Sequence, residues 1–253
     1  MFARMPIRPL VLLAGLLLAG AVIVTAASGA AAPGLPGGVT GLSGTAAVNS
    51  ASVSFAASGS TAPPATSYTV TASPGAEQGF GTTSPITVTG LTPGSAYSFS
   101  VTAANGAGRG VGSAPSAPLT PLAPPTGSTA PAISALKASL VSFFAGVGAH
   151  SGTTLSWSDS VAATTTLTIL RVRSGIVSAG SCVLHGRVAG RRHCQSLLYL
   201  GTLTSADVAG ANTLHFSGRL AGRALAAGLY QVRLTPSLAG VPGNTLKTEL
   251  DVF

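Results

Sequence analysis

Short runs of the chain alternate apolar and polar residues with the two-residue period of a β-strand. The clearest run is residues 97–103, in which Tyr97, Phe99 and Val101 share one face and hydroxyl side chains stand between them. A strand of this kind buries its apolar face, so the run predicts a core strand. Shorter runs upstream predict partners for it, at Val53 and Phe55, at Tyr68, Val70 and Ala72, and at Ile86 and Val88.

The same period returns in the second half of the chain and predicts a second set of strands. Its apolar positions are Leu155 and Trp157, Leu167 and Ile169, Leu214 and Phe216, Tyr230 to Leu234, and Leu246 to Val252. Glycine-containing segments such as 209–212 and 241–244 separate these runs and favour turns. Two groups of strands separated in this way indicate two β-sandwiches.

Composition favours an all-β fold, because only 7% of the residues are charged and alanine, glycine, serine, threonine and valine dominate. The 253 residues suffice for two domains of about 100 residues each. We expect a flexible leader at 31–38, a first domain at 39–119, a proline-rich linker at 120–131 and an Ig-like β-sandwich domain at 132–253.

Residues 1–30 have the features of an export signal. Arg4 and Arg8 give a basic start, Leu10–Val24 is apolar, and Ser28–Ala30 offers small residues for cleavage. The apolar run has about 15 residues, fewer than the roughly 20 that cross a bilayer. We therefore expect cleavage, after which no membrane span is left; retention of the segment as an anchor is the alternative.

Residues 91–108 combine a turn, a strand and a loop. The positions that carry this pattern are Leu91, Pro93, Gly94, Tyr97, Val101, Ala103, Asn105 and Gly108. They resemble the end of a fibronectin type III domain, and the resemblance covers residues 33–120. It implies a β-sandwich in which the Tyr97 hydroxyl bonds back to upstream backbone as a tyrosine corner. The chain departs from the family at Phe55, where a tryptophan is usual.

The second half carries a different pattern. Its motif residues are Gly180, Cys182, Val183, Arg191, Arg192 and Cys194, followed by a glycine- and arginine-containing stretch at 214–230. These motifs resemble a β-sandwich module with a cysteine pair that recurs in secreted actinobacterial proteins. The resemblance implies a fold and brings no function with it.

The two cysteines, Cys182 and Cys194, favour a disulfide, because an exported chain meets an oxidising compartment. The alternative is zinc, since His185 and His193 lie between the cysteines and complete a set of four ligands. In an extended chain, however, adjacent His193 and Cys194 point in opposite directions, which suits a tetrahedral site poorly. We expect the disulfide, no metal site and no cofactor.

The sequence offers little for catalysis. It contains five acids, and the pair that would best suit a glycosidase is Glu249 and Asp251, on one face of the last predicted strand. Neighbouring acids on a terminal strand also serve solubility, and the chain has no Gly-x-Ser-x-Gly motif. We therefore expect a protein without enzymatic activity.

Positive charge is concentrated in the second half, which holds ten of the eleven Lys and Arg residues that follow the export signal. The candidates for anion binding are Arg171, Arg173, Arg191 and Arg192. Guanidinium groups bind the phosphates or carboxylates of an envelope polymer well; the alternative is a surface that arginine keeps soluble. Nucleic acid is not expected, because no aromatic residues are interleaved with the arginines to stack on bases.

These observations predict a secreted, non-catalytic protein of the cell surface that serves as a binding or spacer module. Its expected ligand is anionic or polysaccharide material of the cell wall. An accessory or hydrolytic role in extracellular polysaccharide degradation is the alternative. Trp157 and Tyr199 are candidates for stacking on sugars, although both residue types also fill cores.

Overall fold

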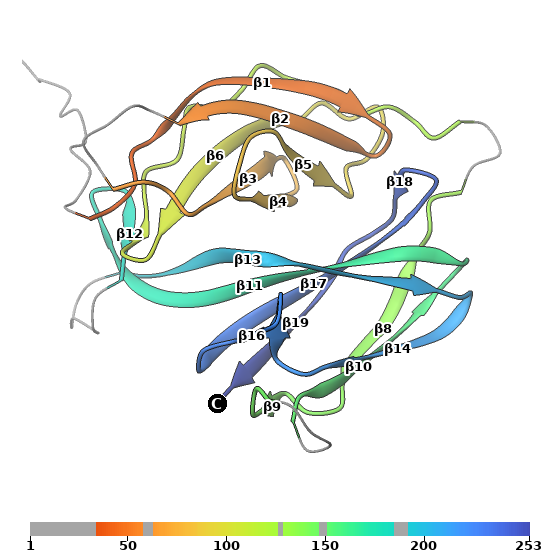
Figure 1. The fold of residues 1–253 in the computed structure, drawn as a ribbon. Helices are drawn as coiled ribbons and strands as arrows, with labels where there is room; N and C mark the ends of the chain where they lie inside the picture. The colour runs from red at the N-terminus through yellow and green to blue at the C-terminus, as the bar shows by residue number, and fades with distance from the viewer. Residues whose placement is uncertain (1–33, 58–62, 126–128, 147–150, 185–191) are drawn as a thin grey trace, which may run out of the picture. The chain divides into compact units, whose positions relative to one another are not determined.

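The alternating runs fold as strands in a computed structural model of the protein, which describes residues 34–57, 63–125, 129–146, 151–184 and 192–253 (Figure 1). Every regular element among these residues is a β-strand, which confirms the all-β prediction. The predicted export signal lies outside the described residues. No helix of the described part is long and apolar enough to cross a membrane.

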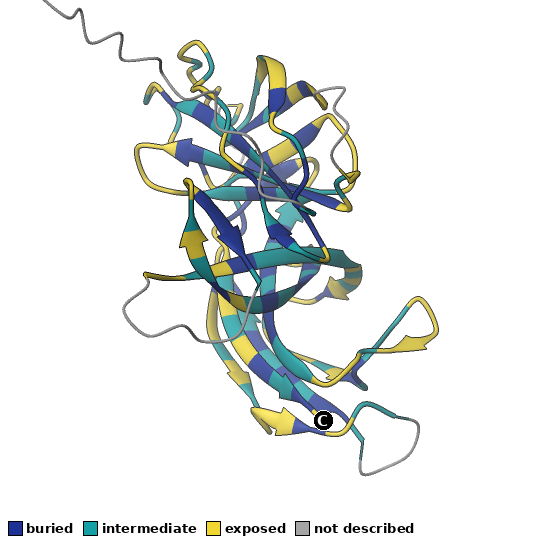
Figure 2. Cartoon of the chain, turned by 90° about the vertical axis from the view of Figure 1, so that its left-hand side faces the viewer, coloured by how far each residue is buried: buried dark blue, intermediate teal, exposed yellow. Residues whose placement is uncertain are grey.

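Two sheets of the first sandwich enclose an apolar core. Its strands are β1 (Val39–Ala47), β2 (Ser50–Ala57), β3 (Ser67–Ser73), β4 (Gln78–Gly81), β5 (Ile86–Thr89), β6 (Ser98–Asn105) and β7 (Gly108–Arg109). One sheet has the order β1-β2-β5, and the other contains β4-β3-β6-β7. Val53, Val70 and Phe99 are fully buried, as the alternating pattern predicts. Buried and exposed positions alternate along the strands in Figure 2.

A tyrosine corner lies at the entry to β6. The Thr92 backbone N–H donates to the Tyr97 hydroxyl over 3.1 Å, and the ring is buried. Gly94 turns the chain at φ +78°, a conformation that favours glycine. Phe55 is buried with its ring centroid 4.9 Å from that of Tyr68, so a phenyl ring occupies the core where the family resemblance leads us to expect an indole.

The second sandwich also has two sheets. One has the order β14-β10-β8, formed by β8 (Ile133–Ala138), β10 (Thr153–Asp159) and β14 (Gly210–Phe216). The other contains β9 (Ser142–Phe143), β11 (Ala163–Ser178), β12 (Ser181–Val183), β13 (His193–Asp207), β17 (Gly228–Leu238), β18 (Val241–Pro242) and β19 (Leu246–Val252). A hairpin joins β15 (Arg219–Leu220) to β16 (Arg223–Ala224). The core between the sheets includes Leu155, Trp157, Leu167 and Val232.

The two sandwiches share a continuous sheet. Strand β7 pairs antiparallel with β12, and Gly108 lies opposite Val183. The strand order β4-β3-β6-β7-β12-β11-β17-β19-β9 therefore runs from one sandwich into the other. Leu184 N–H extends the pairing by donating to the Ala107 carbonyl over 3.0 Å. Backbone pairing thus connects the sandwiches in addition to the chain that leads from one to the other.

The end of the first sandwich reaches into the proline-rich segment. Leu119 pairs with Tyr97 in an antiparallel bridge, and Leu122 pairs with Val48 in a parallel one. The Leu122 N–H donates to the Ala47 carbonyl over 3.0 Å. Residues up to Leu122 are therefore held against the first sandwich.

Candidate functional site

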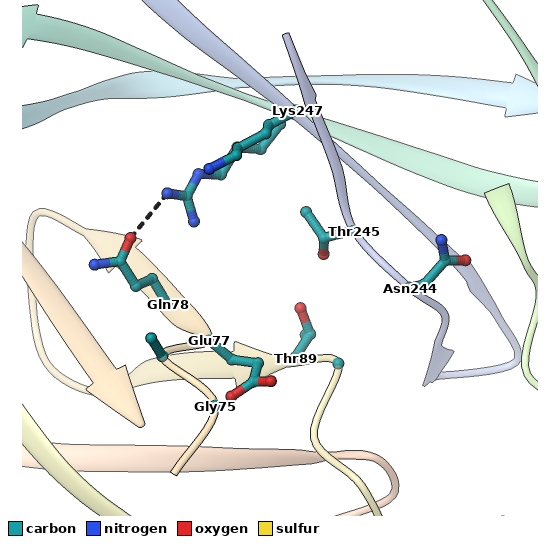
Figure 3. A pocket seen from close by; sticks show the side chains of 10 residues that line it. Gly75, Glu77, Gln78, Thr89, Asn244, Thr245 and Lys247 are labelled. Carbon is teal, nitrogen blue, oxygen red and sulfur yellow. Dashed lines mark hydrogen bonds between the residues drawn. The ribbon is translucent and has the colours of Figure 1, made fainter. Parts of the chain in front are cut away.

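A polar cleft lies between strands of the two sandwiches (Figure 3). It has two compartments of about 380 and 410 Å³, which share Gln78, Thr89, Arg233 and Thr245. Each volume is within the roughly 300–1,000 Å³ of small-molecule sites. Gln78 and Thr89 belong to β4 and β5 of the first sandwich, whereas Arg233 belongs to β17 of the second.

Side-chain hydroxyls are the main polar groups of the larger compartment. They include those of Thr87 on β5, Thr166 and Thr168 on β11, Thr202 on β13 and Thr235 on β17. Thr166 and Thr168 reach the cleft because alternation along β11 directs Leu167 and Ile169 into the core instead. Each hydroxyl can donate one hydrogen bond and accept others, which suits a ligand rich in hydroxyl groups.

Arg233 is a half-buried cation that lines both compartments. Its Nε donates to Gln231 Oε1 over 2.7 Å, and its Nη2 donates to Gln78 Oε1 over 2.8 Å, the bond dashed in Figure 3. The guanidinium carbon lies 4.5 Å from the centroid of the Phe80 ring, a cation–π contact. Burial lowers the pKa of Arg233 to about 10, which leaves the side chain positive at neutral pH.

Two further charged residues line the smaller compartment, Glu77 and Lys247. Lys247 is exposed on β19, beside Thr245, and both lie across the cleft from Glu77 in Figure 3. The Glu77 Oε2 atom is buried and has no hydrogen-bond partner among the described residues. Gly75 leaves room for this carboxylate, because a Cβ atom there would lie 2.3 Å from Oε2.

The arginines selected from the sequence contact different parts of the chain. Arg171 Nη2 donates to the Ala227 carbonyl over 2.9 Å, and Arg173 Nη1 donates to the Gly106 carbonyl over 2.7 Å. Arg192 is exposed, and Arg191 lies outside the described residues. The cleft instead contains Arg233, which the sequence analysis did not select. The available signal was its position in an alternating strand, between Val232 and Leu234 of the core.

Cys182 and Cys194 form the predicted disulfide, with an S–S distance of 2.10 Å and a Cα–Cα distance of 5.8 Å. Of the two histidines in the zinc alternative, His193 is exposed and His185 lies outside the described residues. Within the described part of the chain, no group of three or more His, Cys, Asp and Glu side chains could hold a metal ion.

Asp159 and Asp207 form a pair of buried carboxyl groups that the sequence did not predict. The Trp157 indole N–H donates to Asp159 Oδ2 over 2.9 Å and to Asp207 Oδ2 over 3.1 Å. Asn212 Nδ2 donates to Asp159 over 3.1 Å, and the Ser205 hydroxyl donates to Asp207 over 2.6 Å. Only 3% of Asp159 and 7% of Asp207 is exposed. Trp157 is therefore a core residue that holds two acids and is not available to stack on a sugar.

The acids considered for a glycosidase lie elsewhere. Glu249 and Asp251 are two residues apart on β19, where Glu249 is exposed and Asp251 is half-buried. Neither residue lines the cleft. Tyr199, the second aromatic candidate, is half-buried on β13, opposite Leu170 of β11.

Asp159 makes the stability of the protein depend on pH. Burial raises its pKa to about 6, the Trp157 hydrogen bond opposes the rise, and neighbouring Asp207 adds to it. The folded chain therefore holds this proton more tightly than the unfolded chain, so stability falls as pH rises from about 4 to about 6. We expect Asp159→Asn to remove this loss, which is on the order of 3 kcal/mol or several degrees in Tm.

Thermal unfolding of both proteins at about pH 4 and pH 7 checks this prediction. We subtract the Tm of the original protein from the Tm of Asp159→Asn at each pH. This difference is expected to be larger at about pH 7 than at pH 4. Glu249→Gln, which neutralises an exposed acid, is the matched control and is expected to show no such increase. A difference for Asp159→Asn that stays constant with pH would contradict the prediction.

Comparison with known proteins identifies part of the chain. Residues 36–120 match the family model for the fibronectin type III domain. No curated protein matches the chain. Similar solved structures include the FN1-FN3 domains of chicken CNTN1, with 14% identity and a TM-score of 0.32, covering 87% of this chain and 67% of that one.

Two further similar structures have lower TM-scores than the CNTN1 domains. Chitinase ChiA74 from Bacillus thuringiensis has 18% identity and a TM-score of 0.29, and the match covers 68% of this chain and 29% of that one. A segment of two fibronectin type III domains from chicken tenascin has 11% identity and a TM-score of 0.27, covering 86% and 99%. The family match, the two facing sheets and the corner at Tyr97 together identify residues 36–120 as a fibronectin type III domain.

Proposed function

We propose that the protein is a secreted, non-catalytic binding and spacing protein of the bacterial cell surface. Fibronectin type III domains commonly serve as adhesion or spacer modules, which supports this role for residues 36–120. The Cys182–Cys194 disulfide is consistent with an oxidising, extracellular compartment. The pairing of β7 with β12 supports a spacing function, because it restrains the two sandwiches relative to each other.

The cleft is the observation that carries the proposal. Its polar groups are hydroxyls, amides, one guanidinium and one ammonium, with a single carboxylate, Glu77. Hydroxyls and amides exchange hydrogen bonds with sugars, and the cations attract acidic substituents. These groups favour the binding of a polysaccharide of the cell wall or of the extracellular matrix, with a preference for anionic material.

Adsorption to isolated bacterial cell walls tests the proposal. The full protein is incubated with walls at increasing salt, and both the unbound protein and the reducing sugar released are measured. We expect retention at low salt that weakens as salt screens the charges, without release of reducing sugar. Absence of retention at low salt would overturn the binding role, and sugar release would support the alternative of a hydrolytic role in polysaccharide degradation.

A further inference from the structure

Arg233 carries hydrogen-bond donors that its neighbours do not use. A guanidinium has five N–H groups, and the bonds to Gln231 and Gln78 engage Nε and Nη2. No acceptor for Nη1 is found among the described residues. The two glutamine oxygens and the Phe80 ring hold the guanidinium plane in place. A cation fixed in this way is arranged before a ligand arrives, which reduces the entropy lost on binding.

A second unsatisfied group lies across the cleft. Glu77 Oε2 is buried and accepts no hydrogen bond from the described part of the chain. Glu77 lines the cleft, and a ligand hydroxyl that donates to its carboxylate supplies a hydrogen bond that the protein does not. Thr89 and Thr245 lie between Glu77 and the cations and can bond to further hydroxyls (Figure 3).

We propose that the cleft binds a sugar acid, with its carboxylate on Arg233 and Lys247 and its ring hydroxyls on Glu77 and the neighbouring threonines. This inference rests on the proposed function and narrows the ligand to a polysaccharide that contains uronic acids. The planar guanidinium matches a carboxylate in geometry. The negative charge of Glu77 favours a singly charged carboxylate over a doubly charged phosphate in the same cleft.

Binding of oligogalacturonate by the full protein, measured by calorimetry, tests this ligand class. Its fully methyl-esterified form is the matched probe, because it has the same sugar backbone without the charge. We expect the protein to bind the acid about tenfold or more tightly than the ester, since a charge-assisted hydrogen bond is lost with esterification. Inorganic phosphate as a competitor distinguishes a general anion site from a sugar-acid site.

Variants locate the site. Arg233→Gln is expected to reduce affinity for the acid about tenfold and to leave affinity for the ester unchanged. Because Arg233 packs on Phe80, Lys247→Gln serves as a second variant at an exposed position, with a smaller loss expected. Arg223→Gln, which removes a charge from the exposed β16, is the control and should bind as the original protein does.

Three outcomes would overturn the inference: equal affinity for acid and ester, equal losses for Arg233→Gln and Arg223→Gln, or displacement of the sugar acid by equimolar phosphate. Its failure is distinguishable from failure of the proposed function. If Arg233→Gln adsorbs to cell walls as well as the original protein does, the cleft is not the binding site, but the proposed binding role stands. If the protein binds oligogalacturonate but does not adsorb to cell walls, the proposed role at the cell surface is wrong, but the cleft is still a site for sugar acids.

Discussion

Replacing Gly108 with valine is expected to undock the two β-sandwiches and to lower the free energy of unfolding by about 2–4 kcal/mol. A Cβ atom at this position would lie 2.2 Å from the Cys182 carbonyl oxygen and 2.9 Å from Leu35 Cδ2. The backbone also adopts φ +147°, which strains any side chain and a β-branched one most. Small-angle scattering should detect a larger radius of gyration, and denaturant unfolding should detect the loss of stability.

Gly106→Val is the matched control for this change, because it introduces the same side chain two residues earlier in the same hairpin. A Cβ atom at Gly106 would meet nothing within 4 Å. We expect this variant to keep the radius and most of the stability of the original protein. If Gly108→Val behaved in the same way, the β7–β12 pairing would not be what joins the sandwiches in solution.

Removing the disulfide is expected to cost about 3 kcal/mol of unfolding free energy. Cys182 and Cys194 are 12 residues apart, and the bond restricts the unfolded chain by closing this loop. Cys182 also belongs to β12, the strand that pairs with β7 of the first sandwich. The disulfide is therefore next to the pairing that connects the two sandwiches. The double substitution of both cysteines by alanine, followed by equilibrium unfolding in denaturant, measures the loss.

Reductant provides the control for this second prediction. It should lower the stability of the original protein to nearly that of the double variant and leave the double variant unchanged. Alanine is used because Cys182 is 1% exposed, and a serine hydroxyl there would add the cost of burying a polar group. Equal stability of the original protein with and without reductant would contradict the role assigned to the bond.

The strands were predictable because each alternating run determines which of its own residues face a core. Phe99 and Val101 are buried between hydroxyl residues, as their spacing alone indicates. The cysteine pair was predictable for a different reason, since the expected export to an oxidising compartment and a total of two cysteines leave one disulfide to form. Both inferences depend on local pattern or on counting.

The site was beyond such reasoning, because it depends on contacts between residues far apart in the chain. Arg233 meets Gln78 across 155 positions, and Asp159 meets Asp207 through Trp157. Alternation along β17 shows that Arg233 points away from the core but does not show what lies opposite it. Arg171 and Arg173 were selected for their charge, and each donates a hydrogen bond to a backbone carbonyl that the sequence alone did not indicate.

The junction between the sandwiches also has a mechanical consequence. They are joined by the chain that leads from Leu122 to Ile133, by the pairing of β7 with β12, and by side-chain bonds such as those of Arg173 to Gly106 and of Arg233 to Gln78. Attachments at separated positions restrain the rotation of one sandwich relative to the other. A polymer that bridges Gln78 and Arg233 would add a further attachment, so its capture would stiffen the whole protein.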